Sequence, residues 1–323
     1  MHAAEVHLFG GSAEQGGQGI FQLSLGQQNI RVGKISGKCI WQSYLMGQGL
    51  WHFRDGCLRP AVLSGEITAR LLFRPKSADD DIESVKNALY CLGTLGGLGS
   101  RSRKGFGSLS LISSNKLNSV PKNSGEFKTF VANIIGSIPQ QNALPTFSAF
   151  SSWSRIEISM TGSDAWDLLG AGGKELQMYR SYGRNSGGVH KVNGLPAEQN
   201  FSEDHDLIRN AAAGTCPNEL PQRAVFGLPH NYFFSSDNAK VDIAPSANKR
   251  TRRASPLLMH VHAFPDGTFG LIHTLLPAKF LPEGDPVEFK AKKLTQCRTT
   301  NTEVDWEVIH EYLSRYQARS VIY

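Results

Sequence analysis

The sequence lacks the long apolar run that a membrane-spanning helix requires. No stretch reaches the roughly 18 consecutive uncharged apolar residues that cross a bilayer, and residues 1–5 carry neither a basic flank nor an apolar run. A secretory signal peptide needs both of these features. We therefore expect a cytoplasmic protein that has no membrane partner.

Cysteine is scarce and scattered. Five cysteines are spread through 323 residues, at positions 39, 57, 91, 216 and 297, and no CxxC pair occurs. Zinc knuckles and small disulfide scaffolds both depend on characteristic cysteine spacings. Neither a zinc knuckle nor a disulfide framework is therefore indicated, and the pattern fits a reducing cytoplasm.

Signatures of nucleotide-binding and hydrolytic enzymes are missing too. A Walker loop needs Gly-Lys-Ser/Thr, whereas Lys104 precedes Gly105 and Phe106 here. The dinucleotide pattern fails because Ser102 stands where its third glycine belongs. No Gly-x-Ser-x-Gly elbow and no Cys/His signature occurs. We expect no enzymatic activity of this chain and no cofactor.

The charges that are present are clustered. The chain has a formal net charge of +6, and its basic residues gather around 101–104, 249–253 and 290–293. Acidic residues are concentrated at 79–81 and 203–206. One basic run is usually a solvated face, but three separate runs favour a polyanionic partner such as a nucleic acid.

The first half of the chain predicts an incomplete α+β unit. Strands are expected at 20–25 and 65–74, the second of them half-buried because its apolar residues alternate. Apolar residues at helical spacing predict a helix behind the aspartates at 79–81, and 106–112 predicts another strand. This order is the later part of a split β-α-β unit. Its opening strand and helix are missing, so we expect a truncated start or a partner that supplies them.

The second half repeats this logic after a linker at 114–125 and a short amphipathic helix. The elements predicted there are a strand at 153–160, a helix at 163–182 interrupted by glycines, a helix at 202–214, a strand ending at 224–229, a hairpin of 257–263 with 268–276, a helix after the Thr302-x-x-Asp305 capping box and a last strand at 320–323. We predict two domains, residues 1–140 and 141–323. Residues 26–60 have no regular pattern.

The most informative stretch is the glycine loop, residues 96–108. Glycines alternate there with Arg101, Arg103 and Lys104, and Phe106 follows. Glycine lets the backbone approach a ligand closely, while clustered cations face water or a polyanion. The loop leaves the negative end of a helix, so the helix dipole does not help it bind an anion. Phe106 either stacks on a base or anchors the loop to the core, and the second role is favoured.

Two other clusters of titratable residues are weaker candidates. Residues 203–206 begin a predicted helix, where acidic residues usually offset the helix dipole. His260 and His262 share one face of a predicted strand, and His273 lies on its partner. Three histidines can hold zinc, but no neighbouring carboxylate orients them in sequence. We expect no metal, with His260 and His262 left open.

Several of these stretches resemble one known family. Residues 95–108, Leu-Gly-Gly-Leu-Gly-Ser-Arg-Ser-Arg-Lys-Gly-Phe-Gly-Ser, are similar to the glycine-rich loop of the CRISPR RAMP superfamily. His-Leu-Phe-Gly-Gly-Ser at 7–12, Phe-Gly-Leu-Pro at 226–229 and Arg-Arg-Ala-Ser-Pro-Leu-Leu at 252–258 resemble the first RAMP subunit of the type III-B (Cmr) effector. The resemblance implies tandem ferredoxin-like (RRM-like) domains, the first of which is incomplete here. That family begins with a strand and a helix that this sequence does not contain.

Membership would imply a cytoplasmic, non-catalytic subunit of an RNA-guided antiviral complex. It would contact the 3′ region of the guide RNA and the target RNA, beside other Cmr RAMP subunits that include the backbone nuclease. The expected RNA-binding residues are Gly97, Gly99, Ser100, Arg101, Ser102, Arg103, Lys104, Gly105, Phe106, Gly107, Arg250, Arg252 and Arg253. The alternative function is a guide-RNA processing endonuclease of the same superfamily, with His205 or His230 as general base.

Overall fold

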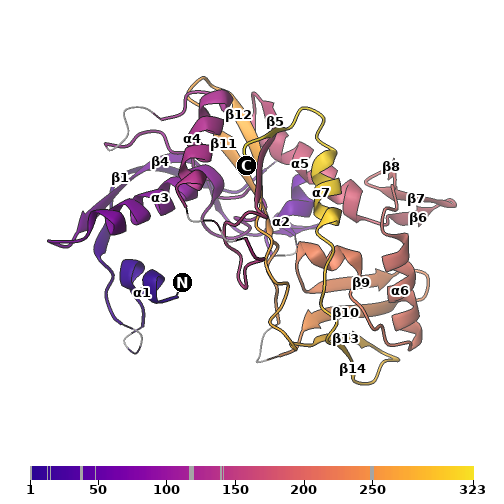
Figure 1. Cartoon of the computed structure of the whole chain (residues 1–323). Helices are drawn as coiled ribbons and strands as arrows, with labels where there is room; N and C mark the ends of the chain where they lie inside the picture. Colours follow the sequence, from indigo (N-terminus) through magenta and orange to yellow (C-terminus); the bar gives the residue numbers. More distant parts are fainter. Residues whose placement is uncertain are drawn as a thin grey trace.

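The computed structural model describes residues 2–12, 14, 16–36, 39–47, 49–115, 120–138, 140, 142–247 and 251–323. Its helices and antiparallel sheets confirm the predicted α+β class (Figure 1). Up to residue 140 the elements are α1 (His2–Phe9), β1 (Phe21–Gly33), α2 (Gln42–Met46), β2 (Trp51–His52), β3 (Gly56–Cys57), β4 (Ala61–Phe73), α3 (Asp79–Leu95) and α4 (Ser124–Gly136). Within the described residues, no helix is both long enough and apolar enough to cross a membrane.

The remaining elements build two four-stranded sheets and a small three-stranded one. They are β5 (Arg155–Gly162), α5 (Ala165–Arg180), β6 (Arg184–Ser186), β7 (Val189–Val192), β8 (Leu195–Pro196), α6 (Ser202–Ala213), the 3-10 helix η1 (Gln222–Phe226), β9 (His230–Phe234), β10 (Ala239–Pro245), β11 (Leu257–Ala263), β12 (Phe269–Leu275), β13 (Val287–Ala291), β14 (Cys297–Thr299), α7 (Glu307–Ser314) and β15 (Ser320–Val321). The predicted helices at α3, α4 and α6 and the β11–β12 hairpin are confirmed.

The central sheet has the strand order β11-β12-β5-β15, and every neighbouring pair is antiparallel. Along the chain its elements follow the order β5, α5, β11, β12, α7, β15, which is the split β-α-β-β-α-β arrangement. Insertions separate α5 from β11 and β12 from α7. A tandem pair of such domains stays a prediction, because β1 and β4 form only a two-stranded sheet.

Both faces of the central sheet are covered. Helices α5 and α7 pack on one face, where Leu176 and Ile309 meet Leu271 of β12. Helix α4 packs on the opposite face, where Phe127 meets Ile272 of the same strand. Successive apolar side chains of β12 therefore point to opposite faces of the sheet and enter two different cores. Helix α4 precedes the predicted domain boundary near residue 140, yet it shares a core with β5 and β12, which follow that boundary. The boundary remains a prediction.

The insertions form the second four-stranded sheet, in the order β14-β13-β10-β9, which the sequence analysis missed. Helix α6 packs on it, and Ile208 joins Val241, Ile243 and Phe289 in a separate core. Strand β10 shows the alternation Val241-x-Ile243 that a half-buried strand requires. That alternation was the available signal.

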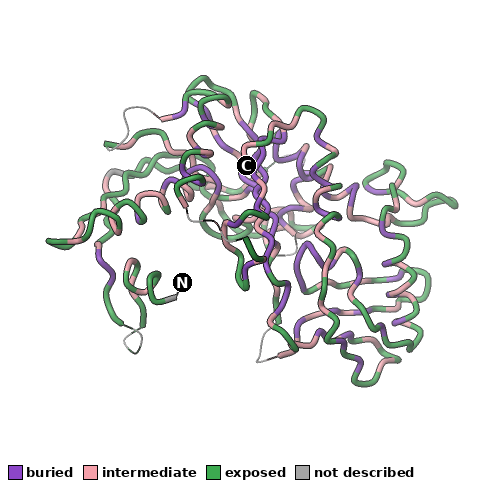
Figure 2. Tube along the Cα trace, in the orientation of Figure 1, coloured by how far each residue is buried: buried purple, intermediate pink, exposed green. Residues whose placement is uncertain are grey.

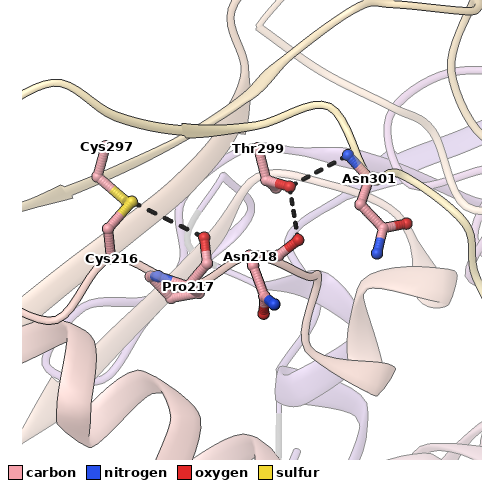
Figure 3. The surroundings of a disulfide bond; sticks show 6 residues. All are labelled: Cys216, Pro217, Asn218, Cys297, Thr299 and Asn301. Carbon is pink, nitrogen blue, oxygen red and sulfur yellow. Dashed lines mark hydrogen bonds between the residues drawn. A yellow bond between two sulfur atoms is a disulfide. The ribbon is translucent and has the colours of Figure 1, made fainter.

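A disulfide links Cys216, just after α6, to Cys297 in β14. The sequence had indicated no disulfide framework, so that expectation was wrong. The two cysteines are separated by 81 residues, a distance that no short spacing motif covers. Figure 3 shows the adjacent hydrogen bonds, in which Thr299 Oγ1 donates to the Asn218 carbonyl (2.8 Å) and accepts from the Asn301 N–H (3.1 Å). The disulfide and these bonds tie the end of α6 to an edge of the second sheet.

Strands β1 and β4 form a long antiparallel ribbon that is exposed along most of its length (Figure 2). Leu23, Leu25 and Leu72 are 54%, 56% and 71% exposed. The prediction of a half-buried strand at 65–74 was therefore wrong, although the strand itself exists. Alternation shows that a strand has an apolar face, but it does not show that another element covers that face.

Three further predictions differ from the structure. Residues 106–112 form no strand; instead, Ser108 Oγ accepts a hydrogen bond from Val261 N (3.0 Å), and Ser110 Oγ accepts one from Ala263 N (2.8 Å). Residues 224–229 belong to η1 and the turn after it, not to a strand. Helix α5 runs unbroken through its glycines. At Gly173 the missing side chain allows the helix to approach the Trp41 carbonyl, which lies 2.6 Å from where a Cβ would be.

Candidate nucleic-acid interface

The glycine loop begins where α3 ends and closes on itself at its base. Gly97 and Ser108 form an isolated antiparallel bridge, and Leu98 N donates to the Gly107 carbonyl at 2.9 Å. Gly107 has φ +64°, and a Cβ there would overlap the Leu98 carbonyl oxygen. Only glycine can stand at this position without moving the loop.

Replacing Gly107 with alanine is expected to open the base of the loop. The overlap with the Leu98 carbonyl adds to the left-handed backbone strain, so we expect a loss of roughly 1–3 kcal/mol in the free energy of unfolding. Urea unfolding measures it. Gly99→Ala is the matched control, because Gly99 has φ +85° but nothing lies within 4 Å of its Cβ position. Equal losses in the two variants would show that the overlap is unimportant.

The second half of the loop is anchored on the core. Lys104 forms an isolated parallel bridge with Met259 of β11, and Met259 N donates to the Arg103 carbonyl at 3.2 Å. Gly105 is buried, and a Cβ there would lie 2.5 Å from Leu169. Phe106 packs edge-on against Trp166 of α5, with ring centroids 6.5 Å apart. This geometry favours the anchoring role for Phe106 over base stacking.

Two of the predicted RNA-binding arginines are occupied inside the protein. Arg103 Nη1 donates to the Ser255 carbonyl at 2.7 Å, and Arg253 Nε donates to the Phe280 carbonyl at 2.6 Å. Arg253 also forms an isolated bridge with Leu228. The glycine loop, the Phe-Gly-Leu-Pro turn and the Arg-Ala-Ser-Pro stretch therefore meet at one place. The glycine loop lies more than 100 residues before the other two stretches, so the sequence did not reveal this meeting.

The other predicted cations face outward. Arg101 is exposed with φ +65°, and a Cβ at Gly47 would lie 2.5 Å from its guanidinium, so the side chain rests on the end of α2. Arg252 is exposed. Arg250 lies outside the described residues. Of the predicted polar and small positions, Gly99 and Ser100 are exposed, and Ser102 is half-buried beside Arg101.

Lys104 is the centre of the loop's electrostatics. Its side chain is half-buried, and within the described residues its ammonium forms no ion pair and no hydrogen bond. Burial, followed by the charges of Arg180, Arg101 and Arg103, lowers the pKa of Lys104 to about 7. Because all three of these neighbours are cations, an anion at this place would relieve their repulsion.

His230 and Arg180 extend this positive region, and sequence reasoning did not assign them to RNA binding. Arg180 Nη2 donates to His230 Nε2 at 3.2 Å. Burial, with the charges of Arg180, Arg223 and Lys104, holds the pKa of His230 well below its ordinary value. The elements that carry these residues are joined to the loop only by tertiary packing, so spacing along the chain held no signal for them.

The acidic cluster lies where it was predicted, because Glu203 and Asp204 stand in the first turn of α6; that they offset the helix dipole stays a prediction. Asp204 is also buried, and it accepts hydrogen bonds from Gln222 N (2.6 Å), Arg223 N (3.0 Å) and Arg223 Nε (3.2 Å). It therefore fixes η1 as well, a role that sequence reasoning did not assign to it. His205 stacks on Tyr182, with ring centroids 4.0 Å apart.

The three strand histidines are used in internal hydrogen bonds. His260 Nδ1 lies 2.7 Å from the Gly96 carbonyl, and its Nε2 lies 3.3 Å from His262 Nδ1. His273 lies between Ser159 (2.6 Å) and Tyr312 (3.3 Å). Across the described ranges, no group of three or more histidine, cysteine, aspartate and glutamate side chains is arranged to hold a metal ion.

Comparison with solved structures finds similarity to the crystal structure of apo Cmr1 from Pyrococcus furiosus. The identity is 17% and the TM-score 0.49, over 99% of this chain and 82% of that chain. No protein-family model matches the chain. No curated protein matches it either.

Proposed function

We propose that this chain is a non-catalytic RNA-binding subunit of a type III-B (Cmr-type) CRISPR effector. It contacts the 3′ region of the guide RNA and the target RNA in the cytoplasm, beside other Cmr RAMP subunits that include the backbone nuclease. The proposal includes two RAMP domains, residues 1–140 and 141–323. The observation that carries it is a glycine-hinged loop, anchored on the core, whose Arg101 and Lys104 have no carboxylate partner in the part of the chain that the structure describes.

Such a loop suits a polymer backbone better than a small ligand. Arg101 and Lys104 supply charge and donors, which suit the phosphates of a strand. Phosphate contacts position a nucleic acid without reading its sequence, which fits a subunit whose specificity resides in a guide strand. The motif resemblance of the glycine loop and the two stretches that meet it supports the same assignment.

Replacing Arg101 and Lys104 together by glutamine is expected to weaken binding of single-stranded RNA and to flatten its salt dependence. Each lost phosphate contact removes roughly 0.7 from the slope of log K against log salt, so the double variant should lose about 1.4. Fluorescence anisotropy from low to moderate salt measures both quantities. Arg103 is kept, because its bond to the Ser255 carbonyl holds the loop in place.

Lys292→Gln provides the matched control for charge. Lys292 is exposed in the turn between β13 and β14, at the far side of the second sheet (Figure 1). The substitution removes one positive charge from the separate basic run 290–293 without touching the loop, so its slope should fall by less than that of the Arg101/Lys104 variant. An unchanged affinity and slope in the Arg101/Lys104 variant at low salt would reject the proposal.

The alternative endonuclease function finds less support in the geometry. A general base needs a free ring nitrogen near pKa 7, whereas His230 Nε2 already accepts a bond from Arg180 and the pKa of His230 is well below its ordinary value. His205 stacks on Tyr182 and its Nδ1 bonds to Asp206 at 3.0 Å, an arrangement that uses only one of the two ring nitrogens. Site-specific cleavage of repeat RNA in EDTA by the wild type, abolished in His205→Gln or in His230→Gln, would establish the alternative instead.

A further inference from the structure

Arg180 and His230 come from elements far away in the sequence and lie within electrostatic range of Lys104. Arg180 is the last residue of α5 and His230 the first residue of β9. Arg180 is held on both sides, because its guanidinium lies 4.8 Å from the ring centre of Phe226 and its carbonyl accepts from Arg223 Nη1 at 2.8 Å. The position of Arg180 is therefore set by the protein and does not depend on a ligand.

These side chains can offer hydrogen-bond donors to a ligand. His230 Nε2 accepts from Arg180, so a neutral imidazole carries its proton on Nδ1, which is left to donate. Arg180 Nε is buried and makes no hydrogen bond among the described residues. A buried donor without an acceptor costs free energy that a ligand oxygen would restore. The ammonium of Lys104 adds further donors, which have no hydrogen-bond partner within the described ranges.

The charge balance of this place is one-sided. The charged groups that act on Lys104 are Arg180, Arg101 and Arg103, and those that act on His230 are Arg180, Arg223 and Lys104. The nearby carboxylate of Asp204 is already bound by Arg223 and two backbone N–H groups. Lys104, Arg180 and His230 are half-buried, so each residue keeps part of its surface in contact with solvent.

We propose that Lys104, Arg180 and His230 form a pocket for one phosphate group, and that this pocket holds a single defined phosphate of the RNA strand that the glycine loop binds. The inference rests on the proposed RNA-binding function and adds position to it. Convergent charge-assisted donors from three elements hold one tetrahedral anion at a defined position, whereas an exposed cation such as Arg101 attracts phosphates without selecting one of them. The phosphate is either an internal phosphodiester or a terminal phosphomonoester.

The test neutralises the phosphates of a short single-stranded RNA one at a time with methylphosphonate, and it replaces a 5′- or 3′-terminal phosphate by hydroxyl. With the wild type, one position should weaken binding about tenfold, the effect of losing charge-assisted hydrogen bonds. In Arg180→Met, which keeps the stem on Phe226, the same position should have no effect, while the penalties at other positions persist. An internal position identifies a phosphodiester, and an end position identifies a terminal phosphate.

Arg209→Met is the matched control. Arg209 lies over the Phe234 ring at 5.0 Å and pairs with Asp237, so it imitates the packing of Arg180 on another helix and should leave the profile unchanged. Arg180→Lys keeps the charge but loses the planar donor set, and it replaces the methionine variant if that variant does not fold. In Arg180→Lys, the loss of affinity caused by methylphosphonate at the sensitive position should be smaller than in the wild type.

The outcomes separate the pocket from the function. Penalties of equal size at every position, or a special position that Arg180→Met leaves intact, would overturn the phosphate pocket while RNA binding through Arg101 and Lys104 stands. Failure of the wild type to bind RNA at any salt concentration would reject both.

Discussion

At pH 4.5 the protein is expected to be several kcal/mol less stable than at pH 7, because three histidines are buried in neutral form. His260 and His262 are 1% exposed and His273 is 0% exposed. Burial, the largest cause for each, lowers the pKa of His260 to about 4 and the pKa values of His262 and His273 to about 3. All three values lie below 6.5, the ordinary value for histidine.

The direction follows from proton binding. Between pH 6.5 and the folded pKa values, the unfolded chain binds protons that the folded chain does not, so stability falls as the pH falls. Each such histidine contributes up to roughly 1.4 kcal/mol per pH unit. Three of them, two units below pH 6.5, can therefore remove a large part of the 5–15 kcal/mol that typically separates folded from unfolded protein.

Urea unfolding at a series of pH values from 7 to 4.5 measures this effect. His262→Phe should reduce the pH slope by one proton, because a phenyl ring can replace the imidazole between Phe127 and Phe264 without titrating. His310→Gln on α7 is the control, since His310 lies outside this buried group. A stability that does not change between pH 7 and 4.5 would contradict the expectation.

Loss of the Cys216–Cys297 disulfide is expected to lower the free energy of unfolding by roughly 4 kcal/mol. The bond closes a loop with a sequence separation of 81 residues, and the chain-entropy relation gives a stabilisation of that order for such a loop. Urea unfolding of the wild type with and without reductant measures the difference, and Cys216→Ser should reproduce the reduced value without reductant.

Thiol titration under denaturing conditions checks that the bond is present. Cys39, Cys57 and Cys91 form no disulfide in the described structure, so three thiols should react before reduction and five after it. Cys57→Ser should remain sensitive to reductant, because it leaves the disulfide intact. Identical unfolding curves for wild type and Cys216→Ser would show that the bond does not stabilise the fold.

The sequence predicted those elements whose pattern and ends are both local. Helix α3 begins with its three aspartates and carries Val85 on its buried stripe. The β11–β12 hairpin turns at Pro265-Asp266-Gly267. The prediction from sequence failed where contacts with a distant segment determine the local structure. The segment after Phe106 alternates like a strand, yet serine hydroxyls make its bonds to β11, and no propensity anticipates that exchange.

The candidate interface divides in the same way. The glycine loop could be predicted because glycines and cations lie within thirteen consecutive residues, 96–108. RNA binding by Arg103 stays a prediction, but its Nη1 donates to the Ser255 carbonyl, and only the folded structure shows that internal bond. Arg180 and His230 reach Lys104 from elements about 75 and 125 residues further along the chain, so no spacing rule connects them.

The two serine hydroxyls that bond to β11 have a consequence for solubility. Strand β11 is an edge of the central sheet, and an open edge is a template on which another chain can add a strand. The bonds of Ser108 and Ser110 to Val261 and Ala263 occupy two of its N–H groups, and Lys104 pairs with Met259 further along. The segment that we propose binds RNA therefore also protects this sheet edge from pairing with another chain. We expect substitutions in this segment to promote aggregation when they remove these bonds.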